Sequence, residues 1–189
     1  MKKLLTQVIL YVLGTLTIWA QGTVNFQNIA VGLNAPVFLG DGVTKVSGPD
    51  YSAALLAGPS PISLSQIATT TFLSGSSAGY FLGGVQTIPT VSGGGTAFVL
   101  IEVWNSALFS TFPFAQSSNM PNAWGQSALF SVITGNPNAT PPEVPAVLTG
   151  LSSISVGQPI PEPTTLALWV LAGLMLGLRL SRGRSTVGR

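Results

Sequence analysis

Near its C-terminus the chain carries a strongly apolar run without any charged residue, from Thr164 to Leu178, which is the pattern of a membrane-spanning helix. A helix over 164–180 would be about 25 Å long, slightly less than the roughly 30 Å hydrocarbon core of a bilayer. Basic residues beside a membrane span favour the cytoplasmic side. The run therefore predicts a transmembrane helix at 164–180 followed by a cytoplasmic basic tail at 181–189. The basic residues that anchor it are Arg179, Arg182 and Arg184.

Directly before this run stand Pro161, Glu162 and Pro163. Each proline fixes its own φ and turns the preceding residue away from helix, so this short peptide is extended and stiff. Such a peptide suits the groove of a protease. A plain stalk beneath a permanent membrane anchor is the alternative interpretation.

The order Pro161-Glu162-Pro163, apolar helix, arginine cluster resembles the PEP-CTERM sorting signal of Gram-negative bacteria. The resemblance covers 159–189. It implies that this segment holds an exported protein at the inner membrane until an exosortase, an integral-membrane cysteine protease, processes it. The opening from Gln21 to Gly58 is similar, more loosely, to the start of small exported proteins with this signal. That likeness names no activity.

Gly173 and Gly177 stand four residues apart within the predicted helix. Small residues at this spacing let two membrane helices approach closely, so the pair is a candidate docking face for the exosortase. Glycine is also common in membrane helices in general. Both interpretations stay open.

The N-terminal segment 1–20 has the three parts of a secretory signal peptide. Lys2 and Lys3 form a positive beginning, an apolar stretch follows, and Ala20 supplies the small residue of a cleavage site before Gln21. Polar threonines dilute the apolar stretch and favour a removable signal over an uncleaved signal anchor. We expect export through the Sec translocon, with both basic ends in the cytoplasm and the intervening chain outside.

The segment between these ends, residues 21–158, has the size of one domain. Its only charged side chains are Lys45, Asp41, Asp50, Glu102 and Glu143, which give a net charge of −3 (one positive, four negative). The basic balance of the whole chain comes from the ends, so nucleic-acid binding is excluded. The chain has no cysteine, so no disulfide can hold this domain together.

The pattern of this domain is β throughout, with short apolar or alternating runs between Gly/Pro turns. The longest apolar run, 96–104, is the predicted central strand, and 128–134 its predicted partner. Short strands at regular spacing predict an all-β fold, an antiparallel β-sandwich of jelly-roll or Ig-like type. The segment 106–125 is a predicted long loop with room for a short helix. The other strands are expected at 23–28, 36–39, 51–57, 69–73 and 79–82, with one or two more within 144–156.

Absent residue types exclude most catalytic sites. The chain has no His and no Cys, so a Ser-His-Asp triad and imidazole or thiolate metal sites cannot exist. Glu102, in an apolar strand, is a candidate for one of the two acids that a hydrolase would need, and a charge on the solvent face or near a strand edge is the favoured interpretation by base rate. Asp41 and Asp50 offer oxygen ligands for calcium, and ordinary turn roles account for both. We expect no enzyme, no cofactor and no metal.

Aromatic residues suggest one binding function for the domain. Trp104, Asn105, Trp124 and Gln126 could form a shallow glycan-binding surface, in which rings stack on sugars and amides bond hydroxyls. The competing interpretation is that these aromatics complete a small core.

The sequence as a whole predicts a non-enzymatic exported protein. We expect it to be anchored transiently in the inner membrane, cleaved near Pro161-Glu162-Pro163, and then found at the cell surface or in the medium. We expect association with extracellular polysaccharide or a biofilm matrix, because the domain is polar and charge-poor. The alternatives are a carbohydrate-binding module and a permanently membrane-anchored surface protein. A hydrolase using Glu102 is a third.

Overall fold

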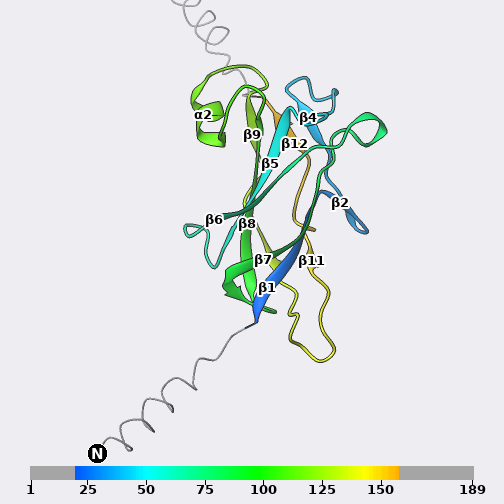
Figure 1. Ribbon diagram of the computed structural model, residues 1–189, viewed down its shortest axis with the longest axis vertical. Helices are drawn as coiled ribbons and strands as arrows, with labels where there is room; N and C mark the ends of the chain where they lie inside the picture. Colours follow the sequence, from blue (N-terminus) through cyan, green and yellow to red (C-terminus); the bar gives the residue numbers. More distant parts are fainter. Residues whose placement is uncertain (1–19, 158–189) are drawn as a thin grey trace, which may run out of the picture. The chain divides into compact units, whose positions relative to one another are not determined.

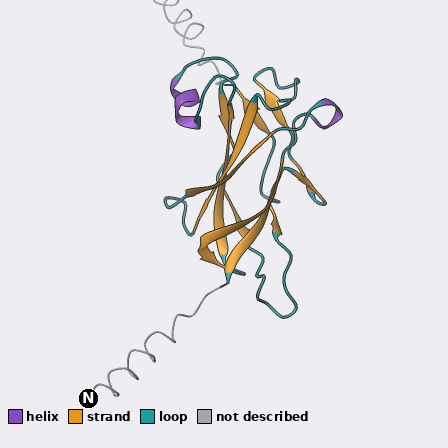
Figure 2. Ribbon diagram, viewed as in Figure 1, coloured by secondary structure: helices purple, strands orange, loops and turns teal. Residues whose placement is uncertain are grey.

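The computed structural model describes residues 20–157 and shows an all-β unit with little helix (Figure 1, Figure 2). The expected all-β class is therefore confirmed. Residues 1–19 and 158–189 lie outside the described part. Between residues 20 and 157 no helix has the length and apolar character that a membrane span requires. The predicted helix at 164–180 falls outside that range.

A five-stranded antiparallel sheet has the order β10-β8-β5-β6, with β9 also pairing β8. The central position of β8 and its pairing with β10 agree with the sequence prediction, because a strand paired on both sides is the most apolar. The β5 segment, flanked by Pro49-Asp50 and Pro59, is a strand as expected. The bounds are β5 (Tyr51–Gly58), β6 (Ser65–Thr71), β8 (Thr96–Asn105), β9 (Trp124–Gln126) and β10 (Phe130–Ile133).

A second sheet has the order β11-β1-β7, and two short pairs complete the structure. The β1–β11 and β4–β12 pairs are parallel, which departs from the purely antiparallel expectation. Parallel neighbours need a long connection between them. Both β11 and β12 come near the end of the described chain, far in sequence from β1 and β4. The bounds are β1 (Gln21–Gln27), β7 (Leu82–Ser92), β11 (Ala146–Val147), β4 (Val37–Leu39) paired with β12 (Ile154–Val156), and β2 (Ile29–Ala30) paired with β3 (Leu33–Asn34).

Strand β7 is much longer than the short run expected at 79–82. The sequence does not predict this strand, because Gly83, Gly84 and Pro89 are unfavourable inside a strand. β7 lies at the edge of its sheet, where proline is tolerated. The register with β1 also shifts there, from Gly22 opposite Ile88 to Gln21 opposite Ser92, so Pro89 lies in an irregular stretch of the ladder.

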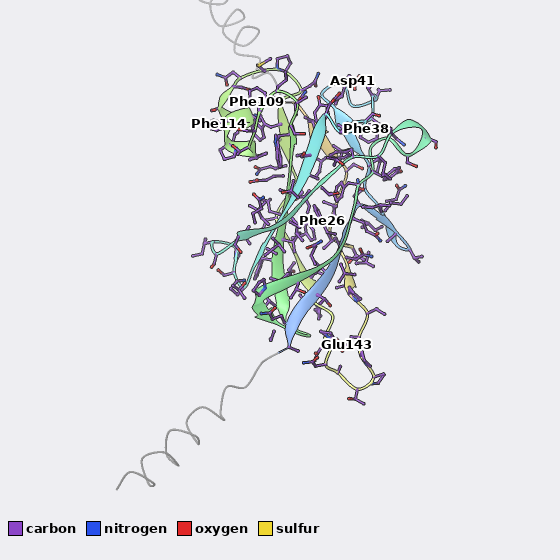
Figure 3. The ribbon with its side chains drawn as sticks, viewed as in Figure 1. Phe26, Phe38, Asp41, Phe109, Phe114 and Glu143 are labelled. Carbon is purple, nitrogen blue, oxygen red and sulfur yellow. The ribbon has the colours of Figure 1, made fainter. Side chains whose placement is uncertain are left out.

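Both large sheets contribute side chains to one apolar core. Phe26 of β1 and Phe81, just before β7, are fully buried, with ring centroids 5.0 Å apart. Phe72 meets Phe81 edge to face at 5.5 Å. Figure 3 shows Phe26 in the middle of the unit, away from both ends. The five-stranded sheet supplies alternate residues from β5 and β8, namely Ala53, Leu55, Ala57, Ala97, Val99, Ile101 and Val103.

Asn28 is a fully buried polar side chain beside this core. Its Nδ2 donates to the carbonyl oxygens of Ala35 and Gly79, each at 2.8 Å, and its Oδ1 accepts from the backbone N–H of Phe81 at 2.8 Å. A buried amide with all these partners is stable, whereas loss of any partner leaves a group without compensation. Asn28 therefore ties the end of β1 to the segment that leads into β7.

The triple glycine between β7 and β8 forms a tightly held turn. The backbone N–H of Gly93 donates to Ala20 at 2.6 Å, that of Gly94 to Thr134 at 3.1 Å, and that of Gly95 to Ser92 at 2.8 Å. Gly94 has φ of +77°, which only glycine adopts without strain. The turn is thus fixed by hydrogen bonds to the neighbouring segments.

Candidate functional site

Strand β8 divides its side chains between two environments. Ile101 and Val103 are fully buried in the core between the sheets. Glu102 and Trp104 point to the opposite, outer face, because successive side chains of a strand alternate. On that face Glu102 stands opposite Ala54 of β5 and Gln126 of β9. The sequence prediction that Glu102 faces away from its apolar neighbours is confirmed.

The helix α2 (Phe112–Ser117) covers one end of this outer face and builds a second, smaller core. This outer cluster consists of Ala54, Trp104, Phe112 and Ala115. Phe112 meets Trp104 edge to face at a centroid distance of 6.4 Å and Trp124 at 5.6 Å. Figure 3 shows Phe109 and Phe114 at the α2 end of the unit. The short helix expected within 106–125 is confirmed.

A groove of about 440 Å³ opens beside the outer cluster. This outer groove has an apolar part and a polar part. The apolar part consists of Leu56, Trp104, Phe112 and Pro113, and the polar part of Gln66, Thr69, Glu102, Ser110 and Thr111. Its volume lies within the range of small-molecule sites.

Glu102 is the charged group of the outer groove. Burial raises the pKa of its carboxyl above the usual value, and no hydrogen bond or opposite charge within residues 20–157 offsets that effect. A partly desolvated carboxylate without a partner is an unfavourable arrangement in the empty protein. A ligand that donates hydrogen bonds to Glu102 would remove this penalty.

The four residues predicted for glycan contact do not form one exposed surface. Trp104 is only 6% exposed and its Nε1 donates to the carbonyl of Phe109 at 3.2 Å. Trp124, directly opposite on β9, is half-buried, and its Nε1 is buried with no hydrogen-bond partner in the described part. Gln126 is exposed beside Glu102. Asn105 accepts a hydrogen bond from the N–H of Leu108 in a local turn. Trp104 and Trp124 thus agree with the competing interpretation, in which the aromatic residues complete a small core.

The four neutral polar residues that line the outer groove were missed by the sequence analysis. Thr69 stands opposite Ala54 and Gln66 opposite Leu56, across a register shift in the β5–β6 pair. Gln66 Nε2 donates to Thr69 Oγ1 at 3.0 Å. Ser110 and Thr111 come from the loop before α2. Only the pairing of β6 with β5 and the folding of this loop bring them together, so no local sequence signal marks them.

The predicted turn aspartate behaves as expected. Asp41 Oδ1 accepts hydrogen bonds from the backbone N–H groups of Val43 at 2.9 Å and Thr44 at 2.8 Å, and Oδ2 accepts from Thr44 Oγ1. The hydrogen bonds from the Thr44 hydroxyl and from these backbone groups lower the pKa of Asp41. No group of three His, Cys, Asp or Glu side chains within residues 20–157 is arranged to hold a metal ion.

The predicted cleavage point lies at the edge of the folded unit. The carbonyl of Ala20 accepts the hydrogen bond from Gly93, and Gln21 begins β1 opposite Ser92. At the other end, Val156 is fully buried at the end of β12. The remaining predicted sites, which are Pro161, Glu162, Pro163, Gly173, Gly177, Arg179, Arg182 and Arg184, lie outside the described residues.

Comparison with protein families, with curated proteins and with solved structures gave no match to this chain.

Proposed function

We propose that the chain is a non-enzymatic exported protein whose β-domain is released or displayed after processing at both ends. The C-terminal cut would be made by an exosortase near Pro161-Glu162-Pro163, and the product would associate with extracellular polysaccharide. The observation that carries the proposal is the position of the terminal strands: β1 begins at Gln21, directly after the predicted signal, and β12 ends at Val156, before the motif. Processing at both places would leave every described strand in the product.

The hydrogen bonding of Ala20 supports an order of events. Its carbonyl pairs with Gly93 in the folded unit, and the next residue is already part of β1. A protease binds its substrate in an extended form, so the bond after Ala20 is accessible only before the sheet closes. Signal cleavage would therefore precede completion of the β1–β7 pairing, as export in an unfolded state requires.

The arrangement of the two large sheets supports a more specific fold class for the exported domain. Two sheets that share one core are the arrangement of a β-sandwich, and we propose that class, of jelly-roll or Ig-like type, with two parallel edge pairs added. The domain carries few charges, so its surface consists mostly of uncharged polar and apolar side chains. Such a surface favours embedding in a hydrated matrix over free solution at high concentration.

A carbohydrate-binding module is the second candidate function. Stacking of sugars on Trp104 is disfavoured by its burial, so the tryptophan surface predicted from the sequence receives little support. The outer groove beside it favours glycan binding by hydrogen bonds instead. A permanently anchored surface protein is the remaining alternative, and it differs only in the fate of 158–189.

Intact mass of the protein recovered from cell envelope and medium tests the processing. Wild type is expected to lack both 1–20 and the segment after Pro163, whereas Glu162→Ala is expected to stay uncut in the membrane. The matched control is Glu143→Ala, which makes the same change at an exposed loop position, where Glu143 Oε2 accepts from the N–H of Asn136. If wild type keeps its complete tail, the motif is a stalk and the protein is permanently anchored.

A further inference from the structure

We propose that the outer groove binds one or two rings of a neutral saccharide, with Glu102 as the central hydrogen-bond acceptor. The groove lies on the outer face of the five-stranded sheet and is separate from the core between the sheets. It is also distinct from the surface of Trp104, Asn105, Trp124 and Gln126 suggested by the sequence, because only Trp104 belongs to both.

The hydrogen-bonding groups of the outer groove suit a ligand rich in hydroxyls. Among residues 20–157 Glu102 has no hydrogen-bond partner, and its carboxylate can accept from two hydroxyls at once. Gln66 uses its Nε2 for Thr69, which leaves its carbonyl oxygen as a further acceptor. The Thr69 hydroxyl accepts that bond and remains free to donate. The polar residues of the groove therefore offer both acceptors and donors.

Thr111 adds a hydroxyl that the fold itself does not use. It stands at the N-cap position of α2, where threonine usually bonds a backbone N–H, yet its side chain makes no cap hydrogen bond. Ser110, next to it, also lines the groove. Both hydroxyls can thus donate to or accept from a ligand without weakening the helix.

The apolar side of the outer groove matches the apolar C–H faces of a sugar ring. Pro113 and Leu56 line the groove together with the accessible edge of Trp104 and Phe112. A pyranose has apolar C–H faces and polar hydroxyl edges, so it can lay a face against this wall while its hydroxyls reach the polar side. Sites of this kind combine a mainly apolar wall with a few placed polar groups.

The composition of the groove favours a saccharide over a cation. Glu102 is the one charged residue among those lining the groove within the described part, so a cation would find a single opposite charge there. The other four polar side chains are neutral groups that can donate to or accept from hydroxyls. A polyhydroxylated ligand can engage all five.

Saturation-transfer NMR on the full chain in deuterated detergent micelles tests the proposal. The probes are glucose, galactose, mannose, rhamnose and N-acetylglucosamine, with spermidine as the amine probe. We expect saturable transfer to at least one sugar. Glu102→Gln is expected to weaken that binding about tenfold, because a charge-assisted hydrogen bond becomes a neutral one. Thr111→Val, which keeps the shape and removes the hydroxyl, is expected to weaken it severalfold.

Glu143→Gln is the matched control, since it makes the same chemical change in the loop at the end of the unit opposite Phe109 and Phe114 (Figure 3). It is expected to leave sugar binding unchanged. Cooperative thermal unfolding of each variant shows that it is folded. No transfer to any sugar, binding of spermidine alone, or sugar binding that Glu102→Gln and Thr111→Val leave intact would overturn the proposal. The intact-mass measurement is independent of this result, so the processing proposal and the groove proposal fail separately.

Discussion

The inner core and the outer cluster lie on the two faces of the same sheet and are built in different ways. The inner core draws on alternate residues of both large sheets and buries Phe26 and Phe81 completely. The outer cluster has four buried members and depends on a loop and the short helix α2 for its cover. It also leaves Trp124 Nε1 buried without a partner in the described part.

This difference separates stability from binding in the molecule. The inner core is apolar and close-packed, and the hydrogen bonds of Asn28 are made within the protein. This region therefore holds the strands in place and offers no groups to a ligand. The outer face combines incomplete cover, a half-buried carboxylate and uncommitted hydroxyls. Such unsatisfied groups are costly for a scaffold and useful for a site. We therefore expect substitutions in the inner core to reduce global stability, and those outside it to act mainly on the groove.

The largest effect is expected from Phe81→Ala. Its ring packs against Phe26 and Phe72, so its removal should lower the free energy of unfolding by about 4 kcal/mol. Phe114→Ala is the matched control, because Phe114 is 62% exposed, and it should change stability by less than about 0.5 kcal/mol. Urea unfolding measures both. Equal losses would contradict the placement of the core.

The next effect is expected from Asn28→Ala. Its removal takes a donor from the carbonyls of Ala35 and Gly79 and the acceptor from the N–H of Phe81, and only Gly79 keeps a second partner, the N–H of Val37, so the cost should be about 3 kcal/mol in total. Asn138→Ala, at an exposed position, is the control and should be nearly neutral. Hydrogen exchange of the Phe81 amide should accelerate in the Asn28 variant alone. An unchanged exchange rate would show that this amide is protected by something else.

A smaller effect is expected from Phe112→Ala in the outer cluster. Phe112 joins Trp104 to Trp124, and the loop above can collapse into part of the space, so the loss should be about 2 kcal/mol. The fluorescence of the two tryptophans should shift at the same time. A loss as large as that of Phe81→Ala would mean that the two clusters form a single core.

The smallest effect is expected from Glu102→Gln, and it depends on pH. Burial raises the folded-state pKa of Glu102 above its usual value, so between the unfolded-state and folded-state pKa the folded protein binds more protons than the unfolded one. Its contribution to stability is therefore present at low pH and lost as pH rises through the folded pKa. The variant should gain slightly on wild type at pH 7 and gain nothing at pH 4 in urea unfolding. A gain at pH 4 that disappears at pH 7 would contradict the sign.

The sequence predicted the parts of the fold that depend on local pattern. The apolar run of β8, its pairing with β10 and the strand β5 all follow from apolar periodicity and Gly/Pro boundaries. Strand β7 was missed because Pro89 and two glycines conceal an edge strand. The parallel β1–β11 pair could not be foreseen, since strand neighbours distant in sequence leave no local signal.

The candidate site was only partly predictable for the same reason. Glu102 and Trp104 stood out in the sequence because one is charged and the other aromatic in an apolar strand. Gln66 and Thr69 reach Glu102 only through the β5–β6 register, and Thr111 only through the turn into α2. The burial of Trp104 likewise depends on the loop that covers it. A groove made from three separate segments is a property of the tertiary fold.

The central claim is that the described strands form a complete folding unit that survives the loss of both flanking segments. The most direct test is to produce residues 21–157 alone and to record its amide NMR spectrum and its urea unfolding curve. We predict dispersed signals and a single cooperative transition, because the inner core and both terminal strands are retained. A collapsed spectrum without a cooperative transition would show that the domain needs its flanking segments, and would contradict release by processing at both ends.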